Sequence, residues 1–151
     1  MAAEARVVGL AGTAKNTGKT TALNALVAAA NARGVPVAAT SIGYDGETVD
    51  NVTGLPKPRI VLPPGAVATT ADSCVPAAGW EVLATTGSWT ALGEVVVVRC
   101  LEAGPIVLAG PNRRTELARV VDQVQALGPA LTLVDGALNR LAPMSVASAF
   151  V

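Results

Sequence analysis

The chain contains 151 residues, of which 51% are hydrophobic and 15% charged, and its 11 basic and 11 acidic residues leave no net formal charge. This composition is typical of one domain with a buried core, and the scattered charges argue against nucleic acid as a partner because no block of Lys and Arg could neutralise a row of phosphates. The lack of histidine excludes Ser-His and Cys-His nucleophiles, and Cys74 and Cys100 form no CxxC pair that would indicate zinc.

The first six residues are of mixed charge and lead directly into an apolar run, which is not the pattern of a secretory signal. No apolar stretch reaches the roughly 18 residues needed to span a bilayer. We therefore expect a cytoplasmic protein whose two cysteines are small, buried, reduced side chains.

The first third of the chain predicts a βαβ unit. Residues 5–11 (ARVVGLA) indicate a buried strand, and residues 12–18 indicate a glycine-rich turn. Residues 19–32 are rich in Ala and Leu and end at Gly34, as a helix does. Residues 35–42 (VPVAATSI) predict a second strand of the parallel type.

The middle of the chain predicts short strands separated by loops. Residues 44–59 are polar and rich in Gly and Pro, which indicates a loop. Two short β-prone pieces follow at 60–62 and 66–70. Residues 81–86 and 94–101 predict a hairpin, because only a short glycine-containing link separates them.

The last third returns to an α/β pattern, with a strand at 105–109, an amphipathic helix at 115–127 and a strand at 130–134. A β-prone piece at 146–151 is either an edge strand or the point where a longer natural chain is cut. The predicted fold class is therefore α/β, a P-loop NTPase-like three-layer sandwich with a mostly parallel sheet and an antiparallel hairpin insertion. Residues 1–151 would form one nucleotide-binding domain, or the N-terminal part of a longer protein.

The turn between the first strand and the first helix carries a phosphate-binding pattern ending in Gly18, Lys19 and Thr20. Backbone N–H groups of such a turn cradle phosphate oxygens, the lysine contacts the β- and γ-phosphates, and the threonine hydroxyl binds Mg²⁺. Strict P-loops have glycine where Thr13 stands, so either the spacing from Gly12 is one residue longer, as in dethiobiotin synthetase-like proteins, or threonine replaces the glycine. The predicted cofactor-binding residues are Gly12, Thr13, Ala14, Lys15, Asn16, Thr17, Gly18, Lys19, Thr20 and Thr21.

Polar residues that follow predicted strands are candidates for the same site, because ligands of open α/β sheets bind beyond the carboxyl ends of the strands. Asp135 follows the apolar run LTLV, the pattern of a Walker-B acid, and we predict that it holds Mg²⁺ together with Thr20. Asp45 orients water, contacts the metal or is only the aspartate of an Asp-Gly turn, and this last alternative also applies to Asp135. The predicted catalytic residues are Lys19, Asp45 and Asp135.

Other basic residues leave two interpretations open, a contact with phosphate or partner and a solvated surface. These residues are Lys15, Lys57, Arg59, Arg113 and Arg114. No [NT]KxD guanine-reading motif is visible, which favours MgATP over GTP as the cofactor. Trp80 and Trp89 flank the predicted hairpin and are expected to pack rather than to stack on a ligand.

The segments GTAKNTGKTTALN, TSIGYDGE, VTGLPKPRI, ALGEVVVVR, LAGPNRR and VDGALNR together resemble the small subunit of the lysine 5,6-aminomutase reactivase. The resemblance runs from about Val8 to Arg140. It implies an ATP-dependent reactivating factor that rescues an adenosylcobalamin-dependent aminomutase with a damaged cofactor. It also implies a second subunit similar to a mismatch-repair ATPase. In this hypothesis nucleotide at Lys19 and Thr20 orders the loop 45–59, which engages the partner subunit or the mutase until hydrolysis releases it.

Three other functions fit the same pattern. The first is an ATP-dependent enzyme of the dethiobiotin synthetase type, which would need a substrate pocket beside the γ-phosphate. The second is a GTP-binding adaptor of the molybdenum-cofactor type, which has a similar N-x-G-K-T-T ending. The third is a non-catalytic interaction domain with a degenerate P-loop.

Overall fold

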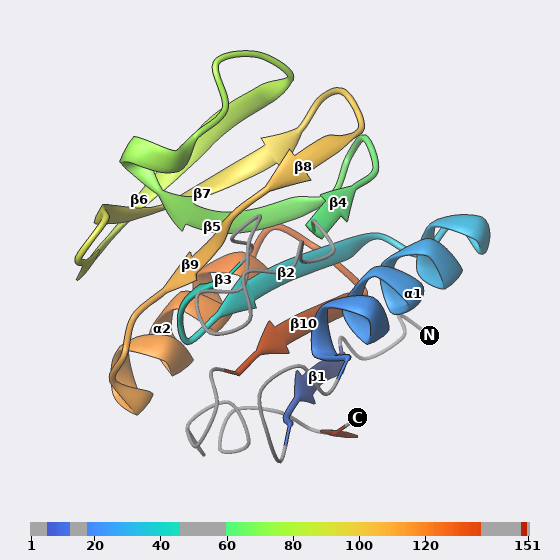
Figure 1. The fold of residues 1–151 in the computed structure, drawn as a ribbon, viewed down its shortest axis with the longest axis horizontal. Helices are drawn as coiled ribbons and strands as arrows, with labels where there is room; N and C mark the ends of the chain where they lie inside the picture. The colour runs from blue at the N-terminus through green and yellow to red at the C-terminus, as the bar shows by residue number, and fades with distance from the viewer. Residues whose placement is uncertain (1–5, 13–17, 46–59, 137–148, 151) are drawn as a thin grey trace.

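The structure is a computed structural model that describes residues 6–12, 18–45, 60–136 and 149–150 (Figure 1). The two α-helices and the short 3₁₀ helix of this part of the chain are α1 (Lys19–Ala32), α2 (Arg114–Gln125) and η1 (Asp72–Cys74). Its strands are β1 (Arg6–Leu10), β2 (Val37–Ser41), β3 (Gly43–Asp45), β4 (Ile60–Leu62), β5 (Val67–Ala71), β6 (Trp80–Thr90), β7 (Gly93–Cys100), β8 (Gly104–Ile106), β9 (Leu108–Gly110), β10 (Leu131–Asp135) and β11 (Ala149–Phe150).

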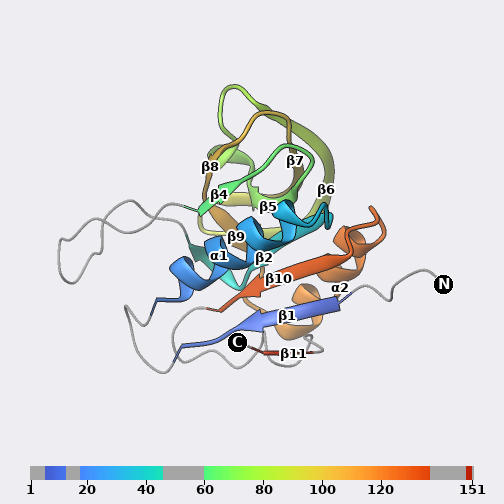
Figure 2. The ribbon, with the colours of Figure 1, turned by 90° about the vertical axis from the view of Figure 1, so that its right-hand side faces the viewer.

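Seven of these strands form one mixed sheet in the order β11-β1-β10-β2-β5-β7-β6. The first five are parallel to their neighbours, and β5, β7 and β6 are antiparallel. Two antiparallel ribbons, β3–β9 and β4–β8, lie outside this sheet. In Figure 2, β1 and β10 lie at one end of the molecule, and β4, β5, β7 and β8 gather at the other.

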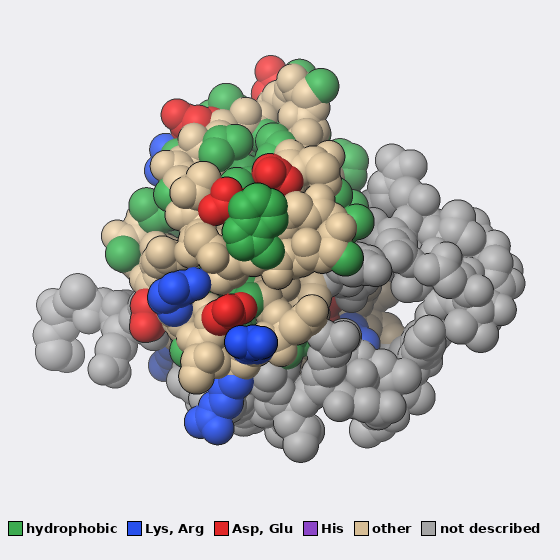
Figure 3. All heavy atoms as spheres, turned by 90° about the vertical axis from the view of Figure 1, so that its left-hand side faces the viewer, with side chains coloured by type: hydrophobic (Ala, Val, Ile, Leu, Met, Phe, Trp, Pro, Cys, Tyr) green, Lys and Arg blue, Asp and Glu red, His purple; other side chains and the backbone are tan. Residues whose placement is uncertain are grey.

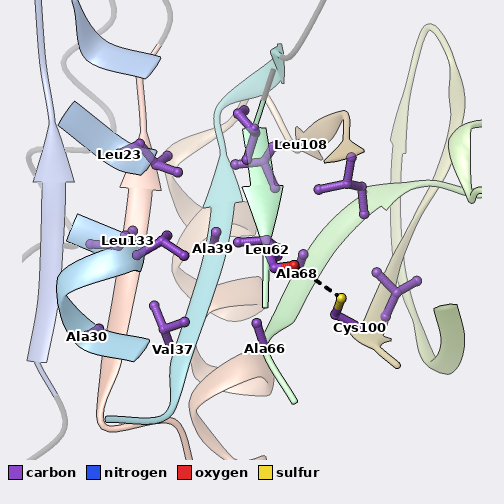
Figure 4. Packing of buried hydrophobic residues seen from close by; sticks show 14 of the residues in the cluster. Leu23, Ala30, Val37, Ala39, Leu62, Ala66, Ala68, Cys100, Leu108 and Leu133 are labelled. Carbon is purple, nitrogen blue, oxygen red and sulfur yellow. Dashed lines mark hydrogen bonds between the residues drawn. The ribbon is translucent and has the colours of Figure 1, made fainter. Parts of the chain in front are cut away.

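The two faces of the sheet are covered differently. On one face Leu23 and Val27 of α1 belong to the same apolar cluster as Leu133 and Ala39 of the sheet, and the β4–β8 ribbon extends this cluster over β5 and β7. Figure 4 shows part of the cluster. On the other face the apolar side of α2 covers the sheet, with its buried residues Leu117, Val120, Val121 and Val124. The face that carries α1 is called the α1 face below.

The predicted fold class is wrong. The chain is β-rich: the described residues form eleven strands but only two α-helices, and the sheet is mixed rather than mostly parallel. The physical reason is that the segments around Ile60 and Ile106 pair with each other as a β-ribbon and cover the sheet where a sandwich would place helices. In addition the β6–β7 hairpin is no insertion, because β7 pairs directly with β5 and continues the main sheet.

Several individual elements were nevertheless predicted correctly. The predicted βαβ unit is present as β1, α1 and β2, and its two strands run parallel to β10, which lies between them. The ends of the β6–β7 hairpin, of α2 and of β10 lie within one or a few residues of the predicted ends. The predicted strand 105–109 is instead two short strands that belong to different ribbons. The piece at the chain end contributes β11, which pairs with β1 at the sheet edge. Most of the predicted loop 44–59 lies outside the described residues.

The two tryptophans have different environments. Trp80 packs against the main apolar cluster, as predicted. Trp89 is 67% exposed, so the packing prediction is wrong for it. Thr86 and Ser88 take the buried positions at that end of β6, and the alternation of the strand turns Trp89 outward. Figure 3 views the molecule from the left-hand side of Figure 1, where acidic, basic and apolar side chains are interspersed.

The buried thiol of Cys100 predicts a difference in alkaline stability. Its Sγ lies 3.1 Å from the carbonyl oxygen of Glu102 and 3.4 Å from that of Leu62, and burial raises the pKa of the thiol above its ordinary value of 9.0. Above that pH the unfolded chain loses the proton first, so the contribution of the protonated thiol to stability is lost as the pH rises. We expect Cys100→Ala to cost about 1 kcal/mol at pH 7 and progressively less above pH 9, in urea unfolding of both proteins from pH 7 to pH 10. A constant difference across this range would contradict the expectation.

Candidate functional site

The candidate site lies where three parallel strands end beside the start of α1. Leu10, Asp135 and Ser41 are the last residues of β1, β10 and β2, and they are register partners across the sheet. Figure 2 shows β1 and β10 pointing toward the side of the molecule where α1 begins. This edge is where ligands of parallel sheets bind.

The side chain of Asp135 lies on the face of the sheet that α1 covers. Alternate residues of a strand share a face, and Leu133 packs in the cluster that contains α1, so Asp135 is directed to the α1 face as well. The Asp135 side chain is fully buried. Helix α1 itself contacts β1, β10 and β2. A lysine, a threonine hydroxyl and a buried carboxylate thus lie at the same end of α1 and of the strands beneath it.

The start of α1 is suited to an anion. Gly18 precedes the helix with φ at 85°, a left-handed conformation that favours glycine, and it has no side chain of its own to cap the helix. Ala22 N donates to Gly18 O in the first helical hydrogen bond, so the preceding N–H groups have no partner within the helix. The first turn contains no acidic residue. N–H groups that have no partner within the helix, together with the positive end of the helix dipole, attract phosphate.

The predicted residues divide into three groups by their place in the structure. Gly12, Gly18, Lys19, Thr20 and Asp135 surround the junction of β1, α1 and β10, with Lys19 and Thr20 half-buried and the neighbouring Thr21 exposed. The predicted residues that lie outside the described part of the chain are Thr13, Ala14, Lys15, Asn16, Thr17, Lys57 and Arg59.

The third group lies away from the junction. The backbone of Asp45 ends β3, pairs with Leu108 of β9, and follows β2 beyond the sheet edge. Arg113 precedes α2 and Arg114 begins it, on the face of the sheet opposite to α1. The structure therefore separates both arginines from Lys19, which favours the surface interpretation for them.

Two residues near the end of β2 were not predicted from the sequence. Thr69 in β5 and Gly110 in β9 hold the end of β2 through contacts described below. For Thr69 the only indication in the sequence was a threonine in an otherwise apolar strand (VATTA). For Gly110 no sequence pattern indicated that β9 passes close to β2.

Comparisons with protein-family models, with curated proteins and with solved structures found no match for this chain. Among the described residues, no group of three or more Cys, Asp or Glu side chains is arranged to hold a metal ion. None of the helices in the same part of the chain is long and apolar enough to cross a membrane.

Proposed function

We propose that this chain binds MgATP at the junction of β1, α1 and β10, and that it serves in the cytoplasm as the nucleotide-binding subunit of a reactivating factor for an adenosylcobalamin-dependent aminomutase. The observation that carries the nucleotide part is the convergence of two separate sequence segments. The Gly18–Lys19 start of α1 and the buried Asp135 lie at one edge and on one face of the sheet.

The residues of this junction have complementary roles in the proposed site. Backbone N–H groups at the start of α1 and the Lys19 ammonium donate hydrogen bonds to the β- and γ-phosphate oxygens. The Thr20 hydroxyl and the Asp135 carboxylate are hard oxygen ligands of the kind that Mg²⁺ takes alongside phosphate oxygens and water. Bound Mg²⁺ would neutralise part of the phosphate charge.

The partner part of the proposal is supported by the sequence resemblance. Its most distinctive segments, SIGYDGE and TGLPKPRI, flank or fall in the stretch that joins β3 to β4. In the proposed cycle, nucleotide bound at α1 favours engagement of a second subunit similar to a mismatch-repair ATPase, and hydrolysis releases it. The radical chemistry belongs to the cofactor of the mutase.

Calorimetric titration of the purified chain with MgATP and MgGTP tests the nucleotide part. We expect saturable binding of one MgATP per chain and weaker binding of MgGTP. A preference for GTP would favour the adaptor function instead. Binding of neither nucleotide would overturn the proposal.

Reactivation of a damaged mutase tests the partner part. The full chain, a candidate second subunit and inactivated lysine 5,6-aminomutase holoenzyme are mixed with fresh adenosylcobalamin, with and without MgATP. Recovery of mutase activity only with both subunits and MgATP is the expected result. Turnover of ATP that instead requires a small-molecule acceptor would contradict the reactivase function.

A further inference from the structure

Strand β9 crosses the ends of β2 and β5 at very close range. A Cβ atom added at Gly110 would lie 1.7 Å from the carbonyl oxygen of Ser41 and 3.3 Å from Oγ1 of Thr40. The backbones of β9 and β2 are therefore in direct contact at Gly110. The strand that continues from β2 also pairs with β9, with Gly43 opposite Gly110.

Buried hydroxyl groups hold this crossing in place. Thr69 Oγ1 donates to the carbonyl oxygen of Ala109 at 2.6 Å, and it lies 2.5 Å from Oγ1 of Thr40. Because the Thr69 proton is used on Ala109, Thr40 is the donor to Thr69. All three residues are fully buried, so water cannot replace either bond if one hydroxyl is removed.

The same stretch of β2 holds the backbone that carries Asp135. Ser41 lies between Gly110 on one side and its register partner Asp135 on the other. The next residue, Ile42, donates its N–H to the carbonyl oxygen of Asp135 at 2.9 Å. A displacement of β9 would therefore move Ser41 and Ile42, and with them the end of β10.

We propose that Thr69 is a positioning residue for Asp135: its hydroxyl fixes β9 against the end of β2, and β2 fixes the carboxylate that binds Mg²⁺. This inference rests on the proposed function, because it assumes a magnesium-bound nucleotide at Asp135. Metal ligands must be held within about half an ångström of their productive geometry, and outer residues that orient a ligand commonly change metal affinity 10- to 100-fold. Thr69 acts through β9 and β2, and in the proposed site it touches neither the nucleotide nor the metal.

The test compares Thr69→Val with Thr69→Ser and with Thr70→Val. Thr70 is the matched control, since it is the next residue of β5, is equally buried, and its hydroxyl has no hydrogen-bond partner among the described residues. ATP binding is measured as a function of Mg²⁺ concentration, well below the unfolding temperature of each variant. We expect T69V to raise the Mg²⁺ concentration for half-maximal binding about tenfold, T69S to restore it, and T70V to leave it unchanged.

Each alternative outcome has a distinct meaning. If T69V unfolds more easily but keeps the wild-type Mg²⁺ dependence, Thr69 is only structural and the inference is overturned. If T69V does not fold, Thr69→Cys takes its place, because its weak S–H donor predicts an intermediate shift and an unchanged Mg²⁺ dependence would reject the idea. A wild-type chain that binds no ATP overturns the proposed function as well, whereas wild-type binding with an unchanged T69V overturns this inference alone.

Discussion

Replacing Lys19 with alanine is expected to abolish measurable binding of MgATP while leaving the fold intact. Lys19 is the first residue of α1, is half-buried, and has no acidic neighbour in the first helical turn, so its ammonium is available to an anion at the helix start. Hydrogen bonds to charged groups contribute about 1.5–3 kcal/mol each. A loss of about 3 kcal/mol in binding free energy weakens the affinity for MgATP about 100-fold. Calorimetric titration of both proteins with MgATP measures this loss.

The matched control is Arg33→Ala. Arg33 follows the last residue of the same helix and is exposed, so the variant removes one positive charge at the opposite end of α1. We expect R33A to bind MgATP like the wild type. Equal weakening in both variants would mean that only the net charge of the protein matters, and unchanged binding in K19A would show that the phosphates do not bind at the start of α1.

The sequence predicts those elements whose pattern is long and local. Helix α1 follows from a run of strong helix formers that ends at a glycine, and Gly34 indeed has a left-handed φ of 66°. Strand β10 and helix α2 follow from apolar runs with a clear period, which their buried residues match. The start of α1 and Asp135 could be named as candidates for the same reason, since each belongs to a short local motif.

The fold class could not be predicted because it depends on pairings between distant short segments. Strands β4, β8 and β9 have three residues each, too few to show a period. Ile60 pairs with Ile106 and thereby covers the sheet with a ribbon, and no local pattern reveals that contact. Thr69 and Gly110 were missed on the same grounds, because their importance comes from the crossing of β9 over β2.

Substitution of Gly110 by alanine is expected to be the most damaging single change for the stability of the chain. The added methyl would lie 1.7 Å from the carbonyl oxygen of Ser41, and a backbone atom, unlike the end of a flexible side chain, cannot turn away. Strand β9 cannot retreat without breaking the Thr69–Ala109 hydrogen bond and its pairing with β3. We expect a loss of at least about 3 kcal/mol in the free energy of unfolding, the upper range for overpacking a buried site, measured by urea denaturation.

Gly104→Ala separates this steric effect from the general consequences of replacing glycine in a strand. Gly104 lies in β8, and a Cβ atom there meets only the carbonyl oxygen of Glu102, at an ordinary 3.6 Å. We expect G104A to change the free energy of unfolding by no more than about 0.5 kcal/mol. If G110A were as stable as G104A, β9 would not cross β2 at this distance, and the route from Thr69 to Asp135 would lose its central contact. If G110A is destabilised as expected and yet folds at low temperature, its displaced β9 should also weaken MgATP binding, because Ser41 lies directly between Gly110 and Asp135.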